Sequence, residues 1–387
     1  MTISNAATIG LLLEKAVNTG VAAGFYAMTA NRDRVVYTGG AGTRDGKAPW
    51  AEDTIAWLAS MTKSIVAVAA LQLVERGVIG LDTPTADVLP ELAAAQVLEG
   101  YDRDVPRLRP VRTPVTLRML LSHTAGAGYS FLSTDLARYQ RENRIPTSLE
   151  CKPASIVDSP LVYEPGTDVR YGTGLEWVGL AISRLTGRDL ATHLREAIFD
   201  PLGMVDTAFG IVDRSRLATV RAKTPDGLVT VPFELPAAPE FFSGGGGLYG
   251  TPRDYFTFLR MLGAGGVFNG SKLLEPETLT AAQQSHSAVF GRLASANPAT
   301  SHDIDMLPGT PVSWSLLGMR NEKRTPQGRP AGTVAWAGGA NCYYWVDTDG
   351  ATAGVLFTQL VPFADPAVIR LFTDIEQATR ARQRSQS

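Results

Sequence analysis

Apolar and polar residues alternate with two different periods along the first 40 positions. Residues 6–19 place apolar side chains every three to four positions and end at Gly20, which predicts a helix with a glycine at its C-terminus. Residues 24–28 and 35–38 are short apolar runs on either side of Asn31-Arg32-Asp33. Two such runs around a polar turn predict a β-hairpin.

The C-terminal part of the chain has a similar strand pattern. Residues 333–336, 342–346 and 353–357 are three runs rich in β-branched, small and aromatic side chains. The polar residues Asp347-Thr348-Asp349-Gly350 join the last two runs and favour a tight turn. We expect these runs to form neighbouring strands.

Helices are predicted between and after these strands. A closing helix is expected from about Pro366 to Arg382, because apolar residues recur there on one face. The long middle of the chain is rich in helical patterns broken by Gly and Pro. The expected fold class is therefore α/β, of the α+β type: an antiparallel sheet built from both chain ends and flanked by helices, with a largely helical insertion. Residues 285–330 carry no pattern that assigns them to an element.

Composition narrows the function classes. The 387 residues are 44% hydrophobic and 19% charged, and their net charge is −2. This balance is ordinary for a soluble enzyme and lacks the basic excess of a protein that binds nucleic acid. The apolar runs are shorter than the ~20 residues that span a bilayer. The first residues lack the basic start and apolar run of a secretion signal, which predicts a cytoplasmic protein without a membrane span. The oligomeric state is left open.

Cysteine and histidine offer little support for metal or disulfide chemistry. Cys151 and Cys342 are the only cysteines, and two buried free thiols are favoured over a single disulfide. The four histidines are far apart, and His123 is interpreted as a structural histidine. No Gly-x-Ser-x-Gly sequence supports a nucleophile elbow.

The strongest candidate nucleophile is Ser60, in Ala59-Ser60-Met61-Thr62-Lys63. Residues 65–74 are apolar on nearly every side with no helix breaker until Gly77, which predicts a buried central helix that begins near Ser60. Three residues correspond to about 300° of helical turn, so Lys63 lies next to Ser60. A buried lysine loses its proton more easily, and a serine needs such a neighbouring base. The alternative is an N-cap serine with a surface lysine, because Ser-x-x-Lys often occurs by chance.

Tyr171 is a second candidate for acid–base chemistry. It follows a turn at Pro165-Gly166 and precedes an apolar helical pattern that starts at Leu175. This places it on a loop at a helix entrance, where side chains commonly reach a site. A phenol beside a lysine ammonium loses its proton more readily and then serves as a general base. The alternative is a tyrosine that only packs in the core.

Two glycine-containing segments are candidates for close backbone approach to a substrate. In Trp336-Ala337-Gly338-Gly339, adjacent glycines in a strand mark close approach or a bulge. A backbone N–H there, together with that of Ser60, suits an oxyanion hole. The segment Ser243–Pro252 contains four consecutive glycines, but the missing Lys-Ser/Thr pair excludes a phosphate-binding P-loop. Close backbone packing near the site is favoured instead.

Together these segments resemble the serine β-lactamase and penicillin-recognising superfamily, in its class C branch, which includes family VIII carboxylesterases and fungal statin acyltransferases. The resemblance runs over roughly residues 8–380. Further phrases in the family's order are Leu73-Val74-Glu75-Arg76-Gly77, Leu120-Leu121-Ser122-His123-Thr124, Tyr163-Glu164-Pro165-Gly166, Pro201-Leu202-Gly203-Met204 and Gly246–Pro252.

The resemblance implies a division of the chain and a set of roles. Residues 1–70 and 240–387 are expected to form a sheet-and-helix domain, and 71–239 a largely helical domain, with the active site in the cleft between them. The implied catalytic residues are Ser60, Lys63 and Tyr171, and the implied oxyanion hole is made by the backbone N–H groups of Ser60 and Gly339. The implied substrate-binding residues are Tyr129, which resembles an aromatic of the acyl pocket, and Thr173, Trp336, Ala337 and Gly338.

Two positions depart from the β-lactamase pattern. Trp336 stands where the lactamases carry the lysine of Lys-Thr-Gly, and Thr173 stands where they carry an asparagine. Loss of the charged partner favours a neutral, partly apolar ester over a charged antibiotic. Arg324 or Arg329 is a candidate substitute cation, which would leave weak β-lactamase activity.

The expected function is a serine carboxylesterase that hydrolyses a small-molecule ester through an acyl-enzyme on Ser60, without metal or cofactor. The alternatives are an acyltransferase, in which an alcohol replaces water, and a weak β-lactamase or D,D-peptidase. From a different class, an inactive binding protein would keep the fold and lose the site. The presence of Ser60, Lys63 and Tyr171 argues against that last alternative.

Overall fold

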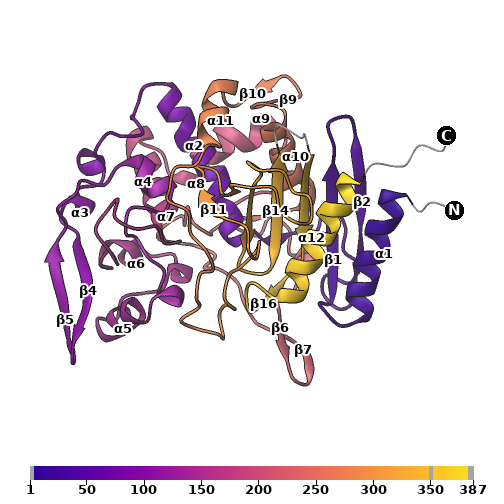
Figure 1. Ribbon diagram of the computed structural model, residues 1–387, viewed down its shortest axis with the longest axis horizontal. Coiled ribbons are helices and arrows are strands. Elements are labelled where there is room, and N and C mark those ends of the chain that lie inside the picture. Colours follow the sequence, from indigo (N-terminus) through magenta and orange to yellow (C-terminus); the bar gives the residue numbers. More distant parts are fainter. Residues whose placement is uncertain (1–3, 348–351, 382–387) are drawn as a thin grey trace.

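One antiparallel sheet forms the centre of the molecule and joins the two ends of the chain (Figure 1). The computed structural model describes residues 4–347 and 352–381. Within them, seven strands follow the order β11-β12-β13-β14-β15-β1-β2, each antiparallel to its neighbours. These strands are β1 (Gly24–Ala30), β2 (Val35–Gly42), β11 (Val312–Trp314), β12 (Met319–Asn321), β13 (Val334–Gly338), β14 (Cys342–Asp347) and β15 (Thr352–Phe357).

The N-terminal hairpin lies directly beside the C-terminal strands. β1 pairs with β15 from Tyr26↔Phe357 to Ala30↔Ala353, and every residue of both strands is buried. The predicted sheet built from both chain ends is therefore confirmed, as are the hairpin and the three C-terminal strands. The predicted turn at 347–350 lies mostly outside the described residues.

Amphipathic helices cover both faces of this sheet. Tyr343 and Trp345 of β14 pack against Phe372 of α12 (Pro366–Arg380). Tyr344 between them packs instead against Tyr255 of α10 (Pro252–Gly263). Successive strand residues point to opposite faces, so α12 and α10 lie on opposite sides of the sheet. α1 (Asn5–Asn18) packs beside α12 and confirms the predicted first helix, as α12 confirms the predicted closing helix.

The buried central helix is α2 (Thr62–Glu75), and it starts where the sequence predicts. A short 3₁₀ turn, η1 (Ala59–Met61), contains Ser60 and leads directly into α2. All of the residues 62–73 are buried, because α2 packs against η1, α7 and α8. Ser64 hydrogen-bonds the Tyr344 hydroxyl at 2.6 Å, which ties the helix to the sheet.

Residues 71–239 contain both helices and unpredicted hairpins. The helices there are α3 (Pro90–Ala93), α4 (Leu117–Leu121), α5 (Thr134–Glu142), α6 (Ala154–Val157), α7 (Gly174–Thr186), α8 (Leu190–Leu194) and α9 (Asp200–Leu202). The hairpins are β4 (Gln96–Asp102) with β5 (Val105–Pro110), and β6 (Arg221–Thr224) with β7 (Gly227–Thr230); β6 also pairs with β16 (Leu360–Val361). The division into two domains stays a prediction.

The remaining elements are short. Strand β3 (Ala56–Trp57) pairs with β8 (Tyr249–Gly250), and β9 (Val267–Phe268) pairs with β10 (Ser271–Lys272). Helix α11 (Pro276–Ala282) precedes the unassigned region 285–330. That region contains β11 and β12, and three residues are too few for a strand period to stand out.

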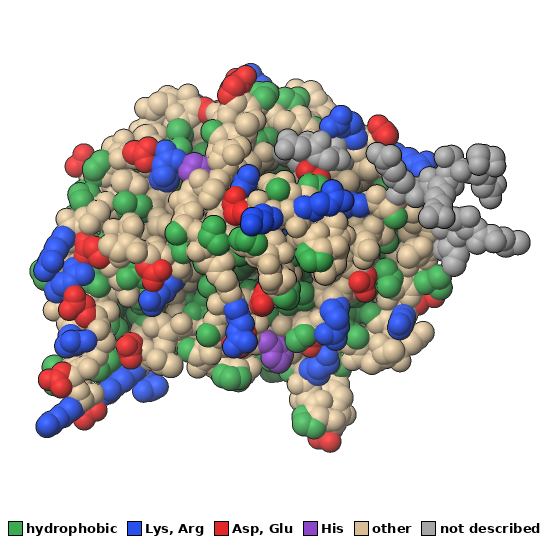
Figure 2. Space-filling model, viewed as in Figure 1, with side chains coloured by type: hydrophobic (Ala, Val, Ile, Leu, Met, Phe, Trp, Pro, Cys, Tyr) green, Lys and Arg blue, Asp and Glu red, His purple; other side chains and the backbone are tan. Residues whose placement is uncertain are grey.

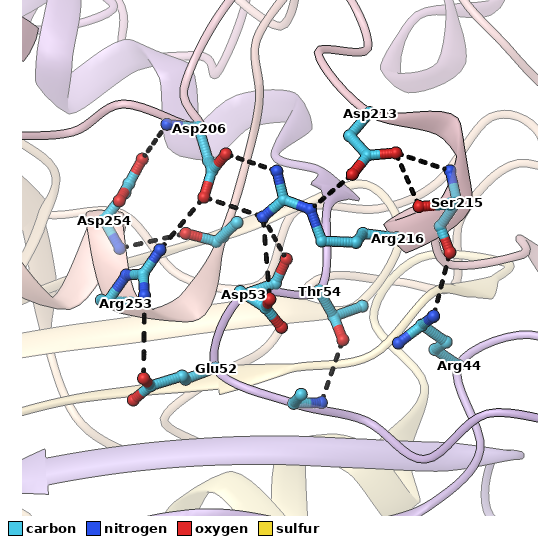
Figure 3. Close-up of polar contacts among 12 residues, drawn as sticks. Arg44, Glu52, Asp53, Thr54, Asp206, Asp213, Ser215, Arg216, Arg253 and Asp254 are labelled. Atoms are coloured by element: carbon cyan, nitrogen blue, oxygen red, sulfur yellow. Dashed lines mark hydrogen bonds and ion pairs between the residues drawn. The ribbon is translucent and has the colours of Figure 1, made fainter.

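A network of charged side chains fixes the chain segment that leads to Ser60 (Figure 3). The Arg216 guanidinium donates to both carboxylate oxygens of Asp206, at 2.6 and 2.9 Å, and to Asp213 at 3.0 Å. It also donates to the backbone oxygen of Asp53 at 3.1 Å. Ile55 then bonds the backbone of Arg216 immediately before β3. The segment of Asp53 and Ile55 is thus anchored a few residues ahead of the nucleophile.

The surface carries charges of both signs. On the face in Figure 2, basic and acidic side chains are interspersed, in keeping with the net charge of −2. None of the helices in the described part of the chain has the length and apolar character needed to cross a membrane. Cys151 and Cys342 are both buried free thiols, as predicted.

Candidate active site

Ser60 lies at a strained junction between β3 and α2. Ala59 has a φ of +47°, in the left-handed region that costs a residue with a side chain about 1 kcal/mol. The strand β13 lies directly against this junction, because a Cβ placed on Gly338 would come within 2.3 Å of the Leu58 carbonyl oxygen. Strain of this kind persists where surrounding structure imposes it, and it gathers at functional sites.

Lys63 directs all three of its N–H donors to oxygen atoms around Ser60. Its Nζ lies 3.0 Å from Ser60 Oγ, 2.9 Å from the Tyr129 hydroxyl and 2.6 Å from the Gly245 carbonyl oxygen. One turn of helix separates Ser60 from Lys63, which brings the two side chains together as the spacing predicts. Lys63 is 5% exposed, so little water competes for these contacts.

Tyr171 reaches Ser60 from the entrance of α7. Its hydroxyl donates to Ser60 Oγ at 2.5 Å and accepts a hydrogen bond from Trp336 Nε1 at 3.3 Å. The loop that carries it is closely packed, because a Cβ on Gly172 would lie 1.7 Å from the Ala127 carbonyl oxygen. The predicted nucleophile and both predicted bases therefore meet at one oxygen atom.

The His123 ring packs against Tyr171. Its Nδ1 accepts the Gly172 N–H at 3.3 Å, and its ring packs against Tyr171 and Trp314 at centroid distances of 4.9 and 4.6 Å. Burial, and secondly the Lys63 charge, hold the pKa of His123 well below its usual range. The ring is therefore neutral at physiological pH, which fits its interpretation as a structural histidine.

The glycines of β13 bring the backbone of Gly339 beside Ser60. A Cβ on Gly339 would lie 3.7 Å from the Ala59 Cβ and 3.6 Å from the Trp57 ring. This placement is compatible with an oxyanion hole made by the N–H groups of Ser60 and Gly339. That role stays a prediction.

Two predicted substrate-binding residues lie against the catalytic side chains. The Tyr129 hydroxyl accepts from Lys63, and its ring stacks on Phe131. Burial raises the pKa of Tyr129 well above its ordinary value, and Tyr171 and Glu176 raise it further. Trp336 is 2% exposed and points its N–H at Tyr171.

The other three predicted positions have less direct contact; of these, Gly338 lies against the Leu58 backbone, as described above. Thr173 lies at the N-terminus of α7, where its N–H bonds the Ala127 carbonyl oxygen. Ala337 is fully buried within β13, opposite Tyr343 of β14. Substrate contact by these residues remains a prediction.

The sequence prediction missed Glu176. This residue is 2% exposed in the first turn of α7, and its Oε1 accepts from Ser243 Oγ at 2.8 Å. The sequence signal that could have identified it is a glutamate within the apolar run from Leu175 to Val178. The four-glycine segment packs beside it, as predicted, since a Cβ on Gly245 would lie 2.5 Å from Glu176 Oε1.

A cavity of about 250 Å³ has Trp336 in its lining, whereas Ser60, Lys63 and Tyr171 do not line it. Most of its lining is apolar and includes Phe290, Leu293, Ile304, Val312 and Trp336 itself. Phe290 stacks on Trp314, which in turn stacks on Tyr171. Within the described residues, no cluster of His, Cys, Asp or Glu side chains is arranged to hold a metal ion.

Of the two candidate cations for a β-lactam carboxylate, Arg329 is held by a carboxylate of its own. Arg329 is 3% exposed and donates from two of its nitrogens to Glu376 on α12, at 2.6 to 3.1 Å. Arg324 is exposed on the turn that follows β12. The charge-assisted contact that Trp336 cannot make is therefore not replaced by Arg329.

Known proteins with similar sequences include an acyltransferase and an esterase. The family model described as Beta-lactamase matches residues 12–378. An acyltransferase of Penicillium decumbens is 32% identical over 344 residues, which cover 84% of this chain and 80% of that protein. The lovastatin esterase of Penicillium rubens is 32% identical over 353 residues, which cover 86% of each chain.

Solved structures extend the likeness to three dimensions. A mutant of simvastatin synthase from Aspergillus terreus superposes with a TM-score of 0.84 at 30% identity, over 97% of this chain and 94% of that one. The predicted fold and the predicted family resemblance are confirmed by these matches. The chain belongs to the beta-lactamase family, in its branch of serine esterases and acyltransferases.

Proposed function

We propose that this protein is a serine carboxylesterase of the family VIII type, which hydrolyses neutral, partly apolar esters through an acyl-enzyme on Ser60. The observation that carries the proposal is the pair of hydrogen bonds to Ser60 Oγ, from Tyr171 at 2.5 Å and from Lys63 at 3.0 Å. Both groups donate to Ser60 Oγ in this structure, and either can act as the base that a serine nucleophile needs once it has lost its own proton.

In the acylation step, Tyr171 takes the proton of Ser60 as Oγ attacks the ester carbonyl. For this step Tyr171 first gives up its own phenolic proton to solvent; its oxygen keeps the Trp336 N–H as a donor, and the Lys63 ammonium lies 5.0 Å from the centroid of its ring. The backbone N–H groups of Ser60 and Gly339 hold the negative oxygen of the tetrahedral intermediate. The C–O bond to the alcohol then breaks, and the alcohol leaves with a proton from Tyr171.

In the second step, water attacks the acyl-Ser60 ester, and Tyr171 accepts a proton from that water. The carboxylic acid leaves and Ser60 regains its hydroxyl proton, so the enzyme returns to its starting state. A neutral substrate is favoured because Trp336 occupies the position of a charged lysine and points its only donor at Tyr171.

Acyl transfer is the second candidate function. An alcohol in place of water in the second step would give a new ester from the same acyl-enzyme. The relatives include both a lovastatin esterase and an acyltransferase, which supports this second candidate. The cytoplasmic location and the preference for small ester substrates belong to the same proposal.

A substrate panel tests the reaction class. We expect p-nitrophenyl esters of short and medium acids to be turned over far faster than the β-lactam nitrocefin. The matched control is Ser60→Ala, which removes Oγ and leaves the fold in place. Nitrocefin turnover that rivals the ester turnover would overturn the esterase proposal in favour of a β-lactamase.

Competition between acceptors separates the two candidate functions. With p-nitrophenyl butyrate as the acyl donor, a series of primary and bulky alcohols is added and the products are measured as acid and new ester. Acid as the main product supports hydrolysis. If a bulky alcohol captures the acyl group faster than water does, the protein is a transferase and the hydrolase assignment is wrong.

A further inference from the structure

The Lys63 ammonium is buried without a carboxylate in contact. Its three donors go to a serine hydroxyl, a tyrosine hydroxyl and a backbone carbonyl. Among residues 4–347 and 352–381, no Asp or Glu oxygen forms an ion pair with it. Lys63 also lies in the first turn of α2, the end of a helix that disfavours a positive charge. A buried charge in such a place needs a counter-charge nearby.

Glu176 is the acidic group placed to supply it. The Gly245 carbonyl accepts from Lys63 at 2.6 Å, and a Cβ on Gly245 would lie 2.5 Å from Glu176 Oε1 and 3.0 Å from the Tyr129 hydroxyl. One glycine therefore separates the ammonium from the carboxylate. The first turn of α7 favours a negative charge on Glu176, and Oε2 has no hydrogen-bond partner.

We propose that Glu176 is a positioning residue whose carboxylate balances the Lys63 ammonium across Gly245 and sets the pH range in which Ser60 reacts. The inference rests on the proposed function and adds Glu176, as a positioning residue, to the Ser60, Lys63 and Tyr171 which that function uses. Glu176 does not contact Ser60 or Tyr171, so it acts through Lys63.

The groups around the carboxylate are few. Lys63 faces it from α2, Tyr129 from the loop before η3 (Ser130–Leu132), Ser243 from the glycine segment, and Cys151 from the loop before α6. Burial raises the pKa of Glu176, and the Lys63 charge is the largest influence that opposes this rise. Burial, and secondly Glu176, raise the pKa of Cys151 to about 11, so this thiol stays neutral.

Removal of the Glu176 charge should shift the pH profile of Ser60 reactivity in one direction. A carboxylate makes each neighbouring proton harder to lose, so its loss lets those protons leave at lower pH. Both limbs of the rate–pH profile of Ser60 should therefore move toward acid in Glu176→Gln. Glu176→Asp keeps the charge and should keep the profile.

The test is the rate of Ser60 labelling by a fluorophosphonate, measured from acid to alkaline pH in the full-length protein. This readout needs no knowledge of the natural substrate. The matched control is Asp254→Asn, because Asp254 is also 2% exposed but bonds Asp206 and Thr207 instead of the site. Circular dichroism checks that each variant is folded.

We expect Glu176→Gln to shift both limbs by roughly one pH unit toward acid, and Glu176→Asp and Asp254→Asn to leave them in place. A labelled Glu176→Gln enzyme with an unshifted profile would overturn the inference and leave the proposed function standing. If Glu176→Gln does not fold, Ser243→Ala decides: loss of the donor to Oε1 leaves the carboxylate charge less screened, so a small shift toward alkaline pH supports the inference and no shift overturns it. If the unsubstituted enzyme is not labelled at all, the proposed function itself is wrong.

Discussion

At the scale of single residues, the site contrasts two tyrosines that touch the same lysine. Tyr171 donates to Ser60 Oγ and receives the N–H of Trp336. Tyr129 accepts from Lys63, and burial raises its pKa far above the physiological range. On this geometry we propose that Tyr171 carries the proton transfer and that Tyr129 is a neutral hydrogen-bond partner.

Replacement by phenylalanine should therefore lower activity by different amounts at the two tyrosines. Tyr171→Phe removes the group that takes the Ser60 proton, so kcat/KM for p-nitrophenyl butyrate should fall roughly 10²-fold or more. Tyr129→Phe removes one hydrogen bond, worth about 1 kcal/mol, so the fall should be roughly 5-fold. Equal losses in the two variants, with both proteins folded, would mean that Tyr171 is not the base.

The same scale shows what the sequence revealed of the site and what it did not. Ser60, Lys63 and Tyr171 were predicted because spacing on a helix and a loop at a helix entrance leave readable patterns. Glu176 was missed because a lone glutamate near a helix start is usually solvated, and its burial depends on the packing of Gly245 from a segment 69 positions away. The hydrogen bond of Trp336 to Tyr171 joins residues 165 positions apart, which no local pattern records.

At the scale of elements, the loop from Asp206 to Arg216 and the start of α10 hold the segment before Ser60. Arg216 bridges Asp206, Asp213 and the backbone of Asp53 (Figure 3). The side-chain hydrogen bonds from Arg216, the largest influence, and the Arg253 charge hold the pKa of Asp206 below its usual range. These contacts form a clamp that holds the segment before Ser60 and includes none of the predicted catalytic residues.

The clamp predicts a stability difference between two neighbouring arginines. Arg216→Met should lower the midpoint of thermal unfolding by roughly 2–5 °C, because it leaves the buried Asp206 with fewer partners. Arg214→Met is the matched control: its side chain is 64% exposed in a pair with Glu234, and a surface pair of this kind contributes little. Differential scanning fluorimetry measures both, and a larger drop for Arg214→Met would contradict the role of the clamp.

Elements also differed in how well the sequence predicted them. Helices α1, α2 and α12 and the strands β1, β2, β13, β14 and β15 were long or regular enough to show their periods. The hairpin of β4 and β5 was missed because both strands are largely exposed and polar, so they lack an apolar repeat. Strands β11 and β12 have three residues each, and pairing within the sheet stabilises them.

At the scale of the whole molecule, the sheet brings the two chain ends together, and the site lies at the C-terminal end of its strand β13. β1 pairs with β15, while β13 carries Gly338 against the Leu58 backbone next to Ser60. α2 then presents Lys63 from the opposite side, and the loop before α7 adds Tyr171. The predicted nucleophile and bases and the predicted oxyanion hole therefore come from three distant parts of the chain, around Ser60, Tyr171 and Gly339, which explains why the fold as a whole is needed for the chemistry.

The central claim is a covalent acyl-enzyme on Ser60, and mass spectrometry after rapid acid quench tests it most directly. The protein is mixed with a slowly hydrolysed ester and then digested, so that the peptide containing Ser60 can be weighed. We predict a mass increase equal to the acyl group on that peptide, which decays as product appears and is absent in Ser60→Ala. Ester turnover without any acylated peptide, or an adduct that survives in Ser60→Ala, would contradict the mechanism.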